Sequence, residues 1–234
     1  MNPILVALDV ESAARAIALA DTLRGSVGGF KIGKQLFTAA GPSMVRELTS
    51  RGDRVFLDLK FHDIPNTVAG AVQAAVATGA WMVNVHASGG SAMMEAAAAA
   101  ARTTAETLGL PRPLVIAVTV LTSMDNEGLA EIGVARPMLD QVVHLATLAQ
   151  ASGLDGVVAS PQEVRAIRSA CGTDFQIVTP GIRPAGQQGK DDQARTLTPA
   201  QALAAGSSYL VIGRPITAAP NPREAAESIA ATLQ

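Results

Sequence analysis

The sequence is short of cysteine, of aromatic residues and of excess positive charge. Its single cysteine, Cys171, excludes an intrachain disulfide framework and leaves too few thiols for a thiolate-rich zinc site. The formal net charge is −2 and no run of Lys and Arg stands out, so nothing predicts a surface for nucleic acid. Aromatic residues make up 3% of the chain, so small aliphatic side chains have to build the core.

Long hydrophobic runs are missing as well. No stretch reaches the roughly 20 apolar residues that a helix needs to span a bilayer, so we expect no contact with a membrane. The apolar run near Met1 is too short for a signal peptide and has no basic flank. Together with the lack of disulfide potential, these absences predict a cytoplasmic protein.

Short apolar segments alternate with alanine-rich segments along the 234 residues, of which 48% are hydrophobic and 16% charged. The apolar segments predict strands at Ile4–Leu8, Gly29–Ile32, Val55–Leu59, Trp81–Val85, Leu114–Val120, Gly156–Ala159, Gln176–Thr179 and Tyr209–Ile212. The others predict helices at Ser12–Leu23, Thr67–Ala77, Ser91–Leu108, Met138–Ala151, Pro161–Ala170, Pro199–Ala204 and Pro222–Leu233. Between residues 35 and 50 the pattern is less regular, and Gly41–Pro42 predicts a break there.

Continuously apolar strands that are each followed by a helix are typical of a parallel sheet covered by helices. Eight such units predict an α/β protein with a single-domain (β/α)8 TIM barrel over residues 1–234. A doubly wound open sheet is the alternative, but it usually has fewer strands, and no Gly-x-Gly-x-x-Gly follows the first strand. In a barrel, functional groups are expected at the carboxyl ends of the strands and in the loops after them.

Charged side chains stand at the ends of the first three predicted strands. Asp9 ends the first, Lys31 lies at the end of the second, and Asp58 and Lys60 end the third. Because side chains alternate along a strand, Asp58 and Lys60 point to the same side. Ionised groups on a buried strand are costly unless they are paired. Three successive strand ends of this kind favour a catalytic cluster over isolated structural ion pairs.

Other polar residues nearby are ambiguous by themselves. Asp63 precedes a helix start with a proline, where a carboxylate commonly caps free N–H groups, and Thr67 is open to the same interpretation. His62 and His86 lack the spacing of metal ligands, so we interpret them as structural and predict no metal site.

A different chemistry is predicted near the end of the chain. Arg183 follows the seventh predicted strand and Arg214 follows the eighth, and the polar loop Gly186–Gln193 lies between them. TIM barrels often bind phosphate with these two loops, and arginine can bind phosphate oxygens in pairs. We therefore predict a phosphate site there, with the loop as a lid over the ligand. Arg168 serves as a surface arginine for comparison.

The run from Asp58 to Thr67 resembles the signature of the orotidine 5′-phosphate decarboxylase family. Five further stretches resemble that family in the same order: Phe30–Gly33, Val85–Gly90, Leu121–Ser123, Thr179–Pro184 and Ile212–Arg214. The resemblance spans nearly the whole chain and implies decarboxylation of orotidine 5′-monophosphate to UMP, without a metal or cofactor, by a homodimer.

The resemblance also implies a role for each matching position. The catalytic set is Lys31, Asp58, Lys60 and Asp63, with Asp63 and Thr67 coming from the partner subunit. Asp9 and Lys31 lie near the ribose, and Thr122 and Ser123 near the pyrimidine. The phosphate contacts are Arg183, Gln193, Gly213 and Arg214.

The chemistry that this substrate requires suits fixed charges. Decarboxylation leaves an electron pair on C6 of the pyrimidine, where no adjacent π system absorbs it, and the sequence has no recognisable motif for an electron-sink cofactor. We expect Lys60 to stabilise the developing carbanion and to donate the proton, held by Lys31 and Asp63. Asp58 is expected beside the departing carboxylate.

Two alternatives remain at this point. A related sugar-phosphate enzyme, such as 3-keto-L-gulonate 6-phosphate decarboxylase, shares the Asp-x-Lys-x-x-Asp strand end but uses magnesium. A catalytically silent nucleotide-binding protein would bind UMP tightly without turnover, although the intact charged set disfavours it. Sensitivity of the activity to EDTA would separate the sugar-phosphate enzyme from the nucleotide enzyme.

Overall fold

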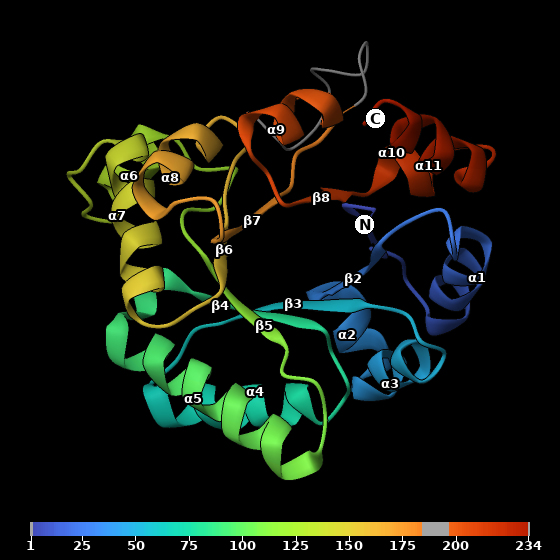
Figure 1. Cartoon of the computed structure of the whole chain (residues 1–234), viewed down its shortest axis with the longest axis horizontal. Helices are drawn as coiled ribbons and strands as arrows, with labels where there is room; N and C mark the ends of the chain where they lie inside the picture. The colour runs from blue at the N-terminus through green and yellow to red at the C-terminus, as the bar shows by residue number, and fades with distance from the viewer. Residues whose placement is uncertain (1, 184–196, 234) are drawn as a thin grey trace.

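The computed structural model describes residues 2–183 and 197–233, which form a closed barrel of eight parallel strands ringed by helices (Figure 1). Each strand pairs with its neighbour in sequence, and β8 closes the barrel against β1. The strands are β1 (Ile4–Ala7), β2 (Gly29–Gly33), β3 (Val55–Phe61), β4 (Met82–His86), β5 (Leu114–Val118), β6 (Gly156–Val158), β7 (Gln176–Thr179) and β8 (Tyr209–Ile212). The predicted fold class is confirmed, and the open sheet is excluded by the pairing of β1 with β8.

The helices lie outside the strands in the order in which they follow them (Figure 1). They are α1 (Ala13–Leu23), α2 (Lys34–Ala40), α3 (Pro42–Ser50), α4 (Pro65–Val76), α5 (Ser91–Leu108), α6 (Asn126–Glu131), α7 (Met138–Ala151), α8 (Val164–Cys171), α9 (Pro199–Ala205), α10 (Arg214–Thr217) and α11 (Pro222–Ala231), with a 3₁₀ turn η1 at Ala87–Gly89. No helix in the described residues is long and apolar enough to cross a membrane.

Local chemistry explains where several helices begin. The Ser12 hydroxyl accepts the backbone N–H of Arg15 at 3.3 Å, which caps α1. Thr198 and Gln201 form a capping box that starts α9. Gly41 separates α2 from α3 with φ of +68°, a conformation that favours glycine, so the predicted break is confirmed.

One predicted helix start is wrong. Pro161 does not begin a helix; the chain makes a turn over residues 161–163, and α8 begins at Val164. The Glu163 carboxylate accepts the backbone N–H of Ser160 at 2.9 Å, which stabilises the turn ahead of the helix. A glutamate that accepts the N–H three residues earlier is one half of a capping box, and the proline alone did not reveal that a turn precedes the helix.

Two hydrophobic layers hold the barrel together. The inner layer fills the barrel with side chains from alternate strand positions, among them Leu5, Phe56 and Ile116. The outer layer packs the opposite strand faces, such as Val55 and Leu57 of β3, against the helices. At the amino end of the strands the inner layer is closed by Trp81 and Tyr209, whose rings meet edge to face with centroids 5.1 Å apart.

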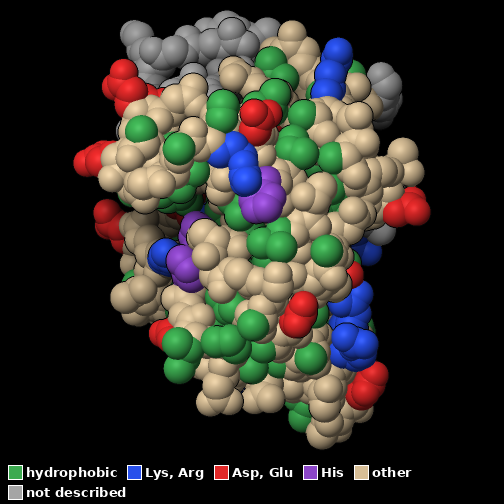
Figure 2. Space-filling model, turned by 90° about the vertical axis from the view of Figure 1, so that its left-hand side faces the viewer, with side chains coloured by type: hydrophobic (Ala, Val, Ile, Leu, Met, Phe, Trp, Pro, Cys, Tyr) green, Lys and Arg blue, Asp and Glu red, His purple; other side chains and the backbone are tan. Residues whose placement is uncertain are grey.

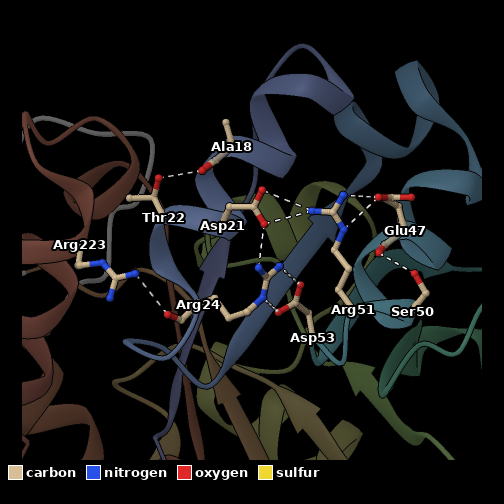
Figure 3. A network of polar contacts seen from close by, with 9 residues as sticks. All are labelled: Ala18, Asp21, Thr22, Arg24, Glu47, Ser50, Arg51, Asp53 and Arg223. Atoms are coloured by element: carbon tan, nitrogen blue, oxygen red, sulfur yellow. Dashed lines mark hydrogen bonds and ion pairs between the residues drawn. The ribbon is translucent and has the colours of Figure 1, made fainter.

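A network of ion pairs ties together loops at the amino end of the barrel (Figure 3). Arg24, after α1, binds both carboxylate oxygens of Asp53, before β3, at 2.9 and 2.7 Å. Arg24 also contacts Asp21, which in turn contacts Arg51 at the end of α3. The network lies at the end of the strands opposite to the one where barrel enzymes place their chemistry.

Candidate active site

A cavity of about 480 Å³ opens among the carboxyl ends of the strands. Its floor is the top of the inner layer, represented by Phe56, Val118, Val158 and Val211. Eight of the predicted site residues line it: Asp9, Lys31, Asp58, Lys60, Thr122, Arg183, Gly213 and Arg214. The barrel thus brings together residues that are up to about two hundred positions apart in the sequence, as the strand-end rule predicts.

The third strand supplies the central pair. Asp58 and Lys60 both face the cavity, as their spacing predicts, and Lys60 Nζ lies 2.5 Å from Asp58 Oδ1. The Asp58 side chain is 11% exposed and that of Lys60 is 25% exposed. The pair is therefore largely withdrawn from water but open to the cavity, where a ligand would meet it.

Two cations and an amide hold Asp58 in its ionised form. Burial by itself would raise the pKa of the Asp58 carboxyl. The nearby charges of Lys31 and Lys60, with hydrogen bonds from Lys60 and Asn84, outweigh burial and bring that pKa below its usual value. Asp58 is consequently a carboxylate at neutral pH.

The second strand extends the cluster toward β1. Lys31 Nζ lies 3.1 Å from Asp9 Oδ1 and 3.5 Å from Asp58 Oδ2, so this lysine bridges two carboxylates. Gly33, two residues further along β2, makes room for the bridge. A Cβ atom on Gly33 would lie 3.0 Å from Lys31 Nζ and 3.2 Å from Asp9 Oδ1.

The loops after β7 and β8 form the opposite wall. Gly181 follows β7 with φ of +76°, and Gly181 and Arg183 both line the cavity. Gly213 and Arg214 follow β8, and Thr217, one helical turn further on, lines the cavity too. Gln193 and the predicted lid lie outside the described residues.

Three of the predicted residues do not line this cavity in the single chain. Ser123 is exposed next to Thr122. Asp63 and Thr67 are exposed near Ile64, a residue that is itself 67% exposed. The Asp63 carboxylate accepts the backbone N–H of Ile64 at 2.6 Å, close to the start of α4.

The prediction missed three residues that the structure brings to the site: Gly33, Asn84 and Thr217. Asn84 is completely buried in β4 and contacts both Asp58 and the backbone of Lys60. Its position, two residues before His86 on an apolar strand, was the available signal, because a buried amide needs polar partners.

The histidines occupy two different settings. The rings of His62 and His86 lie beside the site with centroids 5.4 Å apart, while His144 lies on α7. Figure 2 shows histidines in separate places on one face, with basic and acidic side chains scattered among hydrophobic ones. Among the described residues, no group of three or more His, Cys, Asp or Glu side chains is placed to hold a metal ion.

The charges around the cavity favour an anionic ligand. Among the described residues, its lining holds four cationic side chains, Lys31, Lys60, Arg183 and Arg214, against two carboxylates, Asp9 and Asp58. Cations on both walls fit a molecule with an anionic group at each end.

Comparison with known proteins agrees with this arrangement. Residues 2–229 match the family model described as orotidine 5′-phosphate decarboxylase / HUMPS family. The chain is 59% identical to an orotidine 5′-phosphate decarboxylase of Moorella thermoacetica, over all of this chain and 92% of that protein. It is 55% identical to one of Paramagnetospirillum magneticum, over all of this chain and 99% of the relative. A crystal structure of the Lactobacillus acidophilus enzyme superposes with a TM-score of 0.88 at 39% identity, covering both chains completely.

Proposed function

The chain belongs to the orotidine 5′-phosphate decarboxylase family and converts orotidine 5′-monophosphate to UMP and carbon dioxide, and we propose that Lys60 protonates C6 in that reaction. The reaction is a step of pyrimidine nucleotide synthesis. The observation that carries the proposal is the contact of 2.5 Å between Lys60 Nζ and Asp58 Oδ1 in the cavity. It sets an ammonium donor beside the carboxylate that faces the reacting end of the ligand.

The step balances with residues of this chain alone. The bond between C6 and the carboxylate carbon breaks, carbon dioxide leaves, and the electron pair stays on C6. Lys60 then transfers a proton from its ammonium group to C6, becomes a neutral amine, and regains a proton from solvent before the next turnover. Fixed charges that already surround the site stabilise the developing carbanion without reorganising during the reaction.

Asp58 acts on the bound substrate and raises its free energy, whereas Lys60 lowers the free energy of the carbanion. Lys31, Lys60 and Asn84 keep it ionised, so a substrate carboxylate bound next to it meets a like charge. The repulsion is relieved when neutral carbon dioxide forms. We propose this as a modest ground-state contribution, subordinate to the stabilisation by Lys60.

The remaining predicted residues bind the rest of the substrate in this proposal. Arg183, Gln193, Gly213 and Arg214 bind the phosphate, Asp9 and Lys31 the ribose, and Thr122 and Ser123 the pyrimidine. The cation excess of the cavity supports this assignment, because a phosphate monoester carries between about one and a half and two negative charges at neutral pH. Binding energy from the phosphate can hold the base in a costly arrangement at the distant C6.

We propose further that a homodimer completes the site, with Asp63 and Thr67 supplied by the partner subunit. Both side chains are exposed, and the neighbouring Ile64 is an exposed large hydrophobic residue. A subunit interface over this segment would bury the exposed Ile64 side chain, since the core of an interface is more apolar than the rest of the surface. Asp63 would join Lys31 in holding Lys60.

We also propose the domain organisation of the chain and its location in the cell. Residues 1–234 form one catalytic domain, which the continuous outer core around the barrel supports. The protein works in the cytoplasm, because a phosphorylated nucleotide precursor does not cross membranes unaided.

The ultraviolet absorbance of orotidine 5′-monophosphate tests the proposed role of Lys60. Purified native chain and a Lys60→Ala variant are compared in the presence of EDTA. Native conversion to UMP with a loss of more than about 10³-fold in kcat for the variant is expected, since a positioned proton donor and a buried charge are both removed. Comparable kcat for the two proteins would reject Lys60 as the donor.

The same assay bears on the sugar-phosphate alternative. The family model covers more than one activity by its own description, but relatives at 59% and 55% identity are orotidine 5′-phosphate decarboxylases. Activity that disappears with EDTA and returns with magnesium would contradict the proposed metal-free mechanism.

A further inference from the structure

The backbone of Lys60 adopts an unusual conformation. Its φ is +53°, and no other non-glycine residue in the described ranges has a positive φ. A long side chain in the left-handed region costs free energy, so the surrounding structure has to hold it there. The pairing of β3 with β4 also shifts register between Leu57 and Phe61, around this residue. Lys60 therefore sits in a bulge where the regular ladder of backbone hydrogen bonds is interrupted.

Asn84 of β4 replaces the interrupted ladder bond with its side chain. Its Oδ1 accepts the backbone N–H of Lys60 at 2.8 Å. Its Nδ2 donates to Asp58 Oδ1 at 2.7 Å, and Asp58 Oδ1 is also the oxygen that Lys60 Nζ contacts. Asn84 is completely buried, so water does not compete for either bond.

The orientation of this amide follows from its partners. The Lys60 N–H can only donate, so the side-chain oxygen of Asn84 has to face it. The amide nitrogen is then directed at Asp58, a carboxylate that can only accept. A single buried side chain thus fixes the backbone of the lysine and the oxygen that its ammonium group contacts.

We propose that Asn84 is a positioning residue for decarboxylation, which holds the Lys60 backbone in its left-handed bulge and aligns Asp58 with the Lys60 ammonium group. This inference rests on the proposed function of Lys60 as proton donor. Asn84 acts through Lys60 and Asp58, so its loss should slow the chemical step more than it weakens binding of the nucleotide. Displacing a reacting group by about 1 Å can cost on the order of 100-fold in rate.

Substitution of Asn84 by Asp gives a test with a distinctive pH dependence. The new carboxyl group would face Asp58 and Lys60 on β3, and Lys31 on β2 lies behind Asp58, which it contacts. His86 lies two residues further along the same strand, and the residue paired with position 84 on β5 is the apolar Ile116. When protonated, it can donate to Asp58 as the amide does. When ionised, it repels Asp58. The ratio of variant to native kcat should therefore rise as the pH falls.

The experiment compares native chain, Asn84→Asp and Asn84→Ser, with Asn2→Asp as the matched control. Asn2 also bridges two segments, accepting from the Ile4 N–H at 3.0 Å and donating to the Ser26 carbonyl at 2.8 Å, but at the opposite end of the barrel. We expect Asn84→Asp to lose about 100-fold in kcat at mildly alkaline pH, with the Kd for UMP within about threefold of native. Asn2→Asp should keep the native kcat and the native pH profile.

Fluorescence of the single tryptophan, Trp81, reports whether each variant is folded. If Asn84→Asp does not fold, Asn84→Ser decides: reduced kcat with retained UMP binding supports the proposal. The proposal would be overturned by native kcat in either folded Asn84 variant or by a pH profile of Asn84→Asp that is parallel to the native one. Equal losses of kcat and of UMP affinity would overturn it as well. Failure of the proposed function is distinguished because Lys60→Ala would then turn over like the native chain.

Discussion

At the scale of single residues, Asp58 and Lys60 illustrate what a two-residue spacing on a strand predicts. The alternation that puts both on one face was visible in the sequence, and the structure places both in the cavity. The left-handed backbone of Lys60 was not visible, because it depends on the bulge between β3 and β4 and on the amide of Asn84. Tertiary contacts determine such a conformation, and residue type alone does not.

Arg214 should matter for catalysis more than an arginine outside the site. We expect Arg214→Ala to reduce kcat/KM by roughly 10- to 100-fold or more, because a charge-assisted bond to phosphate contributes about 1.5 to 3 kcal/mol. Arg102→Ala is the matched control, since Arg102 is exposed on α5. Steady-state kinetics with orotidine 5′-monophosphate measure both. Equal small effects would remove Arg214 from the phosphate site.

Arg168, the surface arginine of the sequence comparison, is unsuitable as that control. Its guanidinium donates to the backbone carbonyls of Gly206, Gly172 and Thr173 and to the Ser208 hydroxyl, at 2.8 to 3.1 Å. It thereby ties α8 to the loop before β8. An arginine in a helical pattern gave no sign of these partners, because Gly172 and Thr173 lie past the end of α8 and Gly206 and Ser208 lie about 40 residues further along the chain.

His86 should make the folded chain sensitive to mild acid. Burial first, and then the neighbouring charges of His62 and Lys60, lower the pKa of His86 to about 4 from 6.5. As the pH falls below 6.5, the unfolded chain takes up this proton before the folded chain does, so stability declines down to about pH 4. Above pH 6.5 this group contributes no pH dependence.

Thermal unfolding checks this at pH values on either side of 6.5. We expect the drop in Tm between about pH 7.5 and about pH 5 to be smaller for His86→Asn than for the native chain. His144→Asn is the control, because His144 is exposed on α7. A drop in Tm for His86→Asn as large as that of the native chain would contradict the assignment.

At the scale of secondary-structure elements, most strands and helices were predictable within one or two residues. Gln176–Thr179, Ser91–Leu108 and Met138–Ala151 have the predicted bounds. The helices α6 and α10 were missed because they are short and polar or proline-containing, so no period of apolar residues marks them. β3 runs two residues further than predicted, because its contacts with β4 continue past the bulge. The Lys60 N–H donates to the Asn84 side chain, and Phe61 pairs with Val85.

The ion pair between Arg24 and Asp53 should stabilise the fold without affecting catalysis. The Asp53 side chain is 5% exposed and receives two bonds from Arg24, which joins the loop after α1 to the loop before β3 (Figure 3). We expect Asp53→Asn to lower the free energy of unfolding by about 1 to 2 kcal/mol, between typical exposed and buried pairs.

Urea denaturation followed by Trp81 fluorescence measures that loss. Glu47→Gln is the control, because it breaks the exposed pair with Arg51 one helical turn away. Its effect should be smaller, and kcat should stay native in both variants because the network lies at the amino end of the barrel. Equal effects of the two substitutions would show that the burial of Asp53 adds nothing.

At the scale of the whole molecule, the repeated strand and helix pattern predicted the closed barrel, and the barrel predicted where the site would lie. Seven of the eight strands, all but β4, contribute residues from their carboxyl ends to one cavity, which holds eight of the predicted residues. Asp63 and Thr67 were assigned by resemblance, and in the single chain both lie exposed, Asp63 just before α4 and Thr67 in its first turn. In the proposed dimer, these two residues would enter the cavity of the other subunit.

Mixed dimers of Lys60→Ala and Asp63→Ala chains test the shared site most directly. If the site is shared as proposed, neither variant alone has an intact site, but a mixed dimer regains one, because one chain keeps its own Lys60 and receives Asp63 from its partner. Random pairing of equal amounts of the two chains should recover about one quarter of the native kcat per chain in a symmetric dimer. No recovery after confirmed exchange of subunits would contradict a site built from Lys60 of one chain and Asp63 of the other.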